Sequence, residues 1–210
     1  MIRAVFTWRK SWIERWSKHM KSALVYGADE FFGLSFCERL LEEGVDIGVK
    51  LNQPDDDIRR LYLEERLMWL VRNKHFRIIE KEPESEYDKV FIQYTGCMSE
   101  KELSALTQNK PAVLLVYQHQ MEEDWCQRIA QQGVKTIVLP DMYGPWKAEE
   151  EGPEQGEACF FVDDVAAQLA DFMVHQNLEE LEFEQKTTAE EADAKIEEWK
   201  RQMSTTFDKK

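Results

Sequence analysis

The chain has few of the features that mark metalloproteins, disulfide-bonded proteins and membrane proteins. Its 4 cysteines lie far apart without a C-x-x-C pair, and its 4 histidines are equally scattered, so neither a zinc site nor a disulfide framework is predicted. Its apolar runs are shorter than the roughly 18 residues that a membrane-spanning helix needs. We therefore expect a cytoplasmic protein that binds no metal.

Positive charge is also scarce. The 210 residues include 27 Lys and Arg against 41 Asp and Glu, which gives a formal net charge of -14 at pH 7. Because this charge repels phosphate backbones, we expect no nucleic-acid partner. A hydrophobic content of 43% with 11% aromatic residues excludes a disordered chain, and the length suits one domain with appendages.

Residues 1–21 have the opposite composition, since they are rich in Lys and Arg. Trp8, Trp12 and Trp16 recur at helical spacing, which predicts a basic amphipathic helix. Three interpretations stay open: a helix docked on the acidic body, a helix that binds a membrane surface or a partner, or an extension that precedes a true start at Met20.

Strands and helices alternate through most of the remaining chain. Apolar runs predict strands at 22–26, 45–51, 76–79, 89–94, 112–117 and 135–139, and helical patterns lie after Gly27 and at 55–73, 99–107, 121–132, 164–175 and beyond Thr188. Such alternation is typical of a parallel sheet with helical crossovers. We predict an α/β fold: a Rossmann-like doubly wound parallel sheet at 22–146, with a reduced C-terminal lobe and closing helix at 147–210.

The turn after the first strand has the pattern of a dinucleotide site. It reads Gly27-Ala28-Asp29-Glu30-Phe31-Phe32-Gly33. Three glycines act in such turns: the first bends the chain, the second admits the pyrophosphate, and the third lets helix and strand pack closely. Only the first and third are present here, and Glu30 takes the second position. The helix start suits a pyrophosphate, but the glycines can also serve a plain strand-to-helix turn.

Four segments resemble the extended short-chain dehydrogenases, the NAD-dependent epimerase/dehydratase family, and they occur in the family's order. They are ALVYGADEFFGLSFCERLLEEGVDIGVKL, IVLPDMYGPW, FFVDDVAAQL and AEEADAKIEEWKR. They correspond to the family's opening strand-turn-helix, its Y-G-P segment, its V-D-D-V-A segment and its closing helix. The resemblance implies a Rossmann fold that binds NAD or NADP, in a divergent and shortened member.

The family's catalytic pair is a tyrosine followed four residues later by a lysine, and this chain departs from it. In family order the tyrosine is Tyr117, but the fourth residue after it is Met121, which carries no charge. The resemblance therefore implies that the usual acid/base pair is lost. Tyr117 with His119 is the nearest substitute.

A literal Tyr-x-x-x-Lys occurs elsewhere, at Tyr143 and Lys147. Pro145 lies between them and disfavours the helix that would bring the two side chains together. Tyr143 also matches the family's Y-G-P segment, so we interpret this pair as a coincidence of spacing.

Two further residues bear on the cofactor. Lys50 ends the second strand, where related folds place an acid that binds the adenine ribose. A lysine there suits a 2′-phosphate and favours NADP, unless it only faces solvent. Thr95 follows the fourth strand at the edge of the sheet where ligands bind, and it either faces a ligand or caps the turn.

These patterns lead to one expectation and two alternatives. We expect an NAD(P)-binding-type protein that lacks the usual catalysis, with the dinucleotide retained or lost, and that binds a small molecule or a protein partner. The residues after Tyr143 are too few to enclose a nucleotide sugar well. The alternatives are an NADP-dependent reductase or epimerase that uses Tyr117 with His119 or Tyr143 with Lys147, and a membrane-surface or scaffold protein recruited through residues 1–21. A homodimer stays open.

Overall fold

The computed structural model describes most of the chain. The described residues are 20–29, 31–52, 57–80, 87–94, 100–107, 111–120, 126, 128–129, 131, 134–147, 159–175 and 181–207. The basic helix predicted within 1–21 lies almost entirely outside them, as do Glu30, Thr95 and most of the helix predicted at 121–132.

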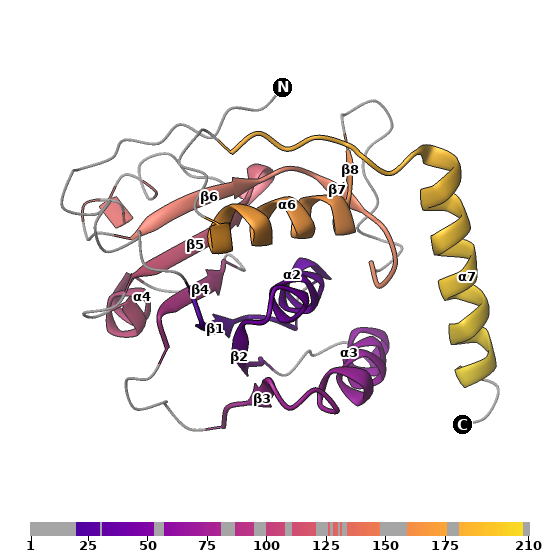
Figure 1. Ribbon diagram of the computed structural model, residues 1–210, viewed down its shortest axis with the longest axis horizontal. Coiled ribbons are helices and arrows are strands. Elements are labelled where there is room, and N and C mark those ends of the chain that lie inside the picture. Colours follow the sequence, from indigo (N-terminus) through magenta and orange to yellow (C-terminus); the bar gives the residue numbers. More distant parts are fainter. Residues whose placement is uncertain are drawn as a thin grey trace.

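Six parallel strands form one sheet in the order β3-β2-β1-β4-β5-β6 (Figure 1). The strands are β1 (Ser22–Tyr26), β2 (Asp46–Lys50), β3 (Phe76–Ile78), β4 (Lys89–Gln93), β5 (Ala112–Tyr117) and β6 (Lys135–Leu139). In the centre, Tyr26 of β1 lies opposite Lys50 of β2 and Ile92 of β4. The strand order reverses at β1, as it does in the Rossmann fold. The predicted α/β doubly wound sheet is confirmed.

Helices cover both faces of this sheet. On one face lie α2 (Phe31–Glu42), α3 (Asp57–Leu70) and α6 (Val162–His175), whose buried side chains join one hydrophobic cluster. On the other face α4 (Glu100–Thr107) contributes Leu103 to a second cluster. Figure 1 shows α2 and α6 on the same side of the strands, with α4 on the opposite side. Strands covered on both faces are apolar along their length, which is why the sequence reveals them.

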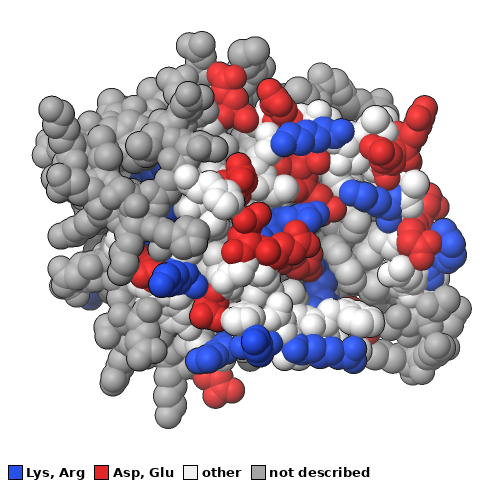
Figure 2. Space-filling model, viewed as in Figure 1, with Lys and Arg blue, Asp and Glu red and all other residues white. Residues whose placement is uncertain are grey.

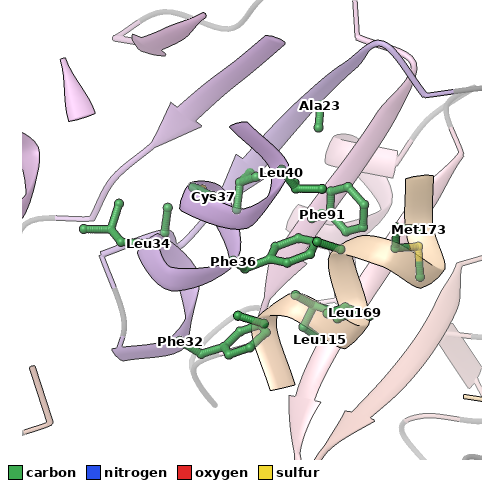
Figure 3. Packing of buried hydrophobic residues seen from close by; sticks show 14 of the residues in the cluster. Ala23, Phe32, Leu34, Phe36, Cys37, Leu40, Phe91, Leu115, Leu169 and Met173 are labelled. Atoms are coloured by element: carbon green, nitrogen blue, oxygen red, sulfur yellow. The ribbon is translucent and has the colours of Figure 1, made fainter. Parts of the chain in front are cut away.

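The phenylalanines of α2 fill the space between the sheet and α6. Phe32 and Phe36 are fully buried, and their ring centroids are 5.8 Å apart. The Phe36 ring meets Phe91 of β4 edge-on at 5.0 Å, while Leu115 of β5 and Leu169 of α6 lie beside the same pair (Figure 3). Each buried phenylalanine stabilises the fold by about 1.5–3 kcal/mol. The position of α2 is therefore fixed by packing.

A second, smaller sheet was not predicted from the sequence. It pairs β7 (Met142–Tyr143) with β8 (Phe160–Phe161) in parallel, so that Tyr143 lies opposite Phe161. Strands of two residues leave no periodic pattern to detect. This sheet joins the Y-G-P segment to the V-D-D segment that begins α6.

The closing helix α7 (Ala189–Phe207) begins with a capping box. The Thr188 backbone N–H donates to Glu191 Oε2 at 3.0 Å, and the Glu191 N–H donates back to Thr188 Oγ1 at 3.2 Å. This reciprocal pair satisfies two backbone donors that a helix start leaves open. The helix predicted beyond Thr188 is therefore confirmed.

An aromatic cluster holds α7 beside α3, at the side of the sheet (Figure 1). Trp199 of α7 lies 5.3 Å from Tyr62 of α3 and 5.6 Å from Trp146, in both cases edge-to-face. Trp146 has a φ of 71°, a left-handed conformation that costs a non-glycine residue about 1–2 kcal/mol. Since Arg66 also lies 5.5 Å from the Trp146 ring, packing on several sides offsets this strain.

At the amino edge of the sheet, Lys89 is buried and Lys135 is partly buried. Lys89 Nζ donates to the Met173 carbonyl of α6 at 3.0 Å, and Lys135 Nζ lies 4.8 Å from the Phe172 ring centroid. Burial lowers the pKa of Lys89 to about 8. Burial, and then the charge of Lys89, lower the pKa of Lys135 to about 7. Ligands of such sheets bind at the opposite, carboxyl edge, so we assign this pair a structural role.

Replacing Lys135 with Met should make stability less dependent on pH. Between about 7 and 10.5 the unfolded chain binds the Lys135 proton and the folded chain does not, so the unfolding free energy of the native protein rises with pH in this window. The variant should therefore gain stability most near pH 7 and progressively less toward pH 10. Urea unfolding at several pH values in this window measures the unfolding free energy of both proteins. Equal slopes of this free energy against pH would contradict the assignment.

Candidate functional site

Gly27 makes the turn that follows β1 at the centre of the sheet. Its φ is 72°, and its backbone N–H donates to the Lys50 carbonyl at 3.1 Å. A Cβ at this position would lie 3.2 Å from the Gln93 carbonyl oxygen. Glycine adopts this conformation without steric cost. The turn thus sits close to the ends of both β2 and β4, at the point where the strand order reverses.

Gly33 lets the first turn of α2 lie directly against the preceding loop. A Cβ on Gly33 would be 2.6 Å from Ala28 Cα and 2.8 Å from the Ala28 carbonyl oxygen. Ala28 and Phe32 are fully buried beside this contact. The close packing that the sequence assigns to the third glycine is what the structure contains. Glu30, at the second position, lies outside the described residues.

The Gly33→Ala variant should lose about 2–3 kcal/mol of unfolding free energy, because its methyl group meets backbone that cannot move freely. Alanine ordinarily stabilises a helix relative to glycine, so the expected sign is the reverse of helix propensity. Gly44→Ala is the matched control: its φ is 78° and nothing lies within 4 Å, so it should lose only about 1 kcal/mol. Urea unfolding compares the two, and equal losses would contradict the packing role.

Asp29 connects the glycine turn to the chain that follows β2. Its Oδ1 accepts a hydrogen bond from the Asn52 backbone N–H at 2.8 Å. Burial raises the pKa of Asp29, and this hydrogen bond acts in the opposite direction. Lys50 Nζ lies 5.5 Å from the centroid of the Tyr26 ring, at the end of the neighbouring strand. The structure therefore brings Asp29, and not only Lys50, to the end of β2.

A chain of polar contacts runs along the carboxyl ends of β4, β5 and β6. Gln93 is 2% exposed, and its Nε2 donates to Tyr117 Oη at 2.9 Å. The Tyr117 ring stacks on His119 at 5.5 Å, and His119 Nδ1 lies 3.3 Å from Asp141 Oδ1. The structure thus joins the two sequence candidates Tyr117 and His119. Sequence analysis missed Asp141, although its position directly beyond β6 was a usable signal.

The Tyr143 and Lys147 side chains bind different partners. Tyr143 Oη accepts from Gln185 Nε2 at 3.4 Å, whereas Lys147 Nζ donates to the Met142 carbonyl at 2.6 Å and lies 5.7 Å from the Phe31 ring. Burial raises the pKa of Tyr143, with smaller contributions from Cys159 and nearby carboxylates, and burial lowers the pKa of Lys147. A proton-transferring tyrosine needs a lowered pKa. This arrangement gives the opposite.

The described part of the chain contains no group of three or more His, Cys, Asp or Glu side chains placed to hold an ion. Within the described residues, Cys37, Cys126 and Cys159 form no disulfide bond. On the face in Figure 2, acidic and basic side chains lie interspersed, and Asp163 of α6 is 3.8 Å from Arg39 and 3.7 Å from Lys195.

Among the described helices, none is both long and apolar enough to span a bilayer.

Two solved structures from Bacillus species share this fold. The UDP-glucuronic acid 4-epimerase of Bacillus cereus in complex with NAD matches with a TM-score of 0.51 and 14% identity, over 70% of this chain and 72% of that chain. Pal from Bacillus thuringiensis matches with a TM-score of 0.61 and 12% identity, over 87% of this chain and 99% of that chain. This likeness shows that the chain shares the Rossmann-like fold of these two proteins.

No model of a protein family matches the chain. A curated relative does: "Uncharacterized protein YjaV" of Bacillus subtilis is 43% identical over 196 residues, which cover 90% of this chain and 100% of YjaV. The chain belongs to the YjaV family.

Proposed function

We propose that this chain binds a nicotinamide adenine dinucleotide at the β1–α2 turn and acts through that binding, without the proton-transfer chemistry of the dehydrogenases. The observation that carries the proposal is the Gly27 turn itself. It lies at the point of the sheet where the strand order reverses, and ligands of open α/β sheets bind outside the carboxyl ends of the strands at that point.

The residues around this turn fit a dinucleotide. The segment from Gly27 to Gly33 leads into the amino end of α2, whose backbone N–H groups and dipole favour a pyrophosphate. The backbone oxygen and Cβ of Gln93 lie close to Gly27, and the buried Oε1 of the same side chain has no hydrogen-bond partner among the described residues. A buried amide oxygen without a donor is unfavourable, and a ligand donor at this edge would satisfy it.

A bound dinucleotide would bring a nicotinamide ring capable of hydride transfer. The described residues supply no tyrosine and lysine that act together on a substrate proton. Met121 stands where the lysine would follow Tyr117, and Lys147 donates to a backbone carbonyl instead of to Tyr143. These arrangements support dinucleotide binding without the tyrosine–lysine chemistry of the short-chain dehydrogenases.

A second candidate function rests on the contacts of Tyr117. Its hydroxyl accepts from Gln93, and its ring stacks on His119, which in turn contacts Asp141. A histidine oriented by a carboxylate is a common general acid or base. A reductase that draws its proton from Tyr117 or His119 is the alternative that this cluster favours.

Dinucleotide binding can be measured directly on the wild-type protein. Titration with NADH, followed by energy transfer from tryptophan to the reduced nicotinamide, should saturate, and ADP-ribose should displace the ligand. Bound ligand at a hundredfold over its dissociation constant should raise the unfolding free energy by about 2.7 kcal/mol. The absence of saturable binding by NAD(H) and NADP(H) alike, with no change in melting temperature, would contradict the proposal.

The Tyr117→Phe variant separates binding from the reductase alternative. We expect no turnover of NADH or NADPH with a panel of aldehydes and ketones in the wild-type protein, and unchanged NADH binding in the variant. The reductase alternative instead predicts wild-type turnover that falls by about 10²–10⁴-fold when the hydroxyl is removed. Tyr143→Phe is the matched control, since its hydroxyl contacts only Gln185 among the described residues.

A further inference from the structure

A carboxylate from another segment lies at the end of β2, where β2 itself has no acidic residue. In dinucleotide-binding sheets an acid at this position accepts hydrogen bonds from the hydroxyls of the adenine ribose. Here the strand ends at Lys50 and continues through Leu51 to Asn52. Asp29, however, reaches over from the β1–α2 turn, and its Oδ1 accepts from the Asn52 N–H at 2.8 Å. The carboxylate at the end of β2 therefore belongs to the β1–α2 turn and not to β2 itself.

This carboxylate has capacity left for a ligand. Two carboxylate oxygens offer about four lone-pair positions, and the described contacts, from the backbone N–H groups of Asn52 and of Asp29 itself, use two of them. The hydrogen bond to Asn52 also holds the side chain in one orientation, so binding a ligand would cost little additional ordering. The side-chain amide of Asn52 lies beside Gly27, with its Nδ2 3.9 Å from where a Cβ of Gly27 would be. The two neighbouring hydroxyls of a ribose could donate to the lone pairs of Asp29 that the described contacts leave open.

The positive charge of Lys50 lies toward the face of the sheet that α4 covers. Its Nζ is 5.5 Å from the Tyr26 ring centroid, and Tyr26 packs in the hydrophobic cluster that α4 covers. Asp29 instead belongs to the turn that leads into α2, which covers the opposite face. A 2′-phosphate at the end of β2 would therefore meet a carboxylate of like charge, which disfavours its binding.

We propose that Asp29 accepts hydrogen bonds from the adenine-ribose hydroxyls and makes this protein select NAD(H) over NADP(H). The inference rests on the proposed dinucleotide site and assigns its specificity. It reverses the preference that Lys50 alone suggests in the sequence.

The test compares the affinities of NADH and NADPH in the wild-type protein, Asp29→Asn and Lys50→Gln. The wild-type protein should bind NADH more tightly than NADPH. Asp29→Asn keeps an oxygen for the Asn52 N–H but removes the charge, so its NADH affinity should fall by about tenfold, with NADPH affinity unchanged or increased. In Lys50→Gln both affinities should stay within about twofold, because the ammonium does not face the ligand. Circular dichroism and melting temperature check that each variant is folded.

The outcomes separate this inference from the proposed function. Tighter binding of NADPH than NADH by the wild-type protein, or selective loss of NADPH binding in Lys50→Gln, would overturn the role of Asp29 and leave the dinucleotide site intact. An unchanged NADH to NADPH ratio in folded Asp29→Asn would overturn it as well. Failure of the wild-type protein to bind either dinucleotide would overturn the proposed function and, with it, the preference.

Discussion

The contact between the start of α2 and the turn before it is the constraint on which the site depends. A Cβ on Gly33 would come within 2.6 Å of the Ala28 backbone, so the helix can approach the sheet only because no side chain intervenes. From there Phe32 and Phe36 reach the core beside α6 (Figure 3). Gly27 stays close to the ends of β2 and β4. The absence of a side chain at Gly33 therefore permits both the packing of the core and the geometry of the turn.

Most of the large sheet is predictable because each strand is a short apolar run. The bounds of β1, β5 and β6 agree with the prediction. Gly27 makes the expected turn with a positive φ, and Gly33 makes the expected close packing. The small sheet of β7 and β8 was missed because its strands have two residues each. The aromatic cluster around Trp146 was missed because it joins segments far apart in the sequence.

The site is less predictable than the fold, since it is made by contacts between turns. Motif comparison finds a lysine at the end of β2 and no acid, yet Asp29 arrives there through a hydrogen bond to Asn52, 23 residues along the chain. The contact between His119 and Asp141 likewise joins the ends of two strands. Pro145 lies between Tyr143 and Lys147 and disfavours the helix that their spacing would need, and the two side chains bind different partners.

Nuclear magnetic resonance of the uniformly ¹⁵N-labelled protein, titrated with NADH, tests the central claim most directly, because it reports each backbone amide separately. The account predicts saturable shifts centred on Gly27, Ala28 and Asp29, with Asn52 among the next affected. Shifts confined to other parts of the molecule, or none at all, would contradict a dinucleotide site at this turn.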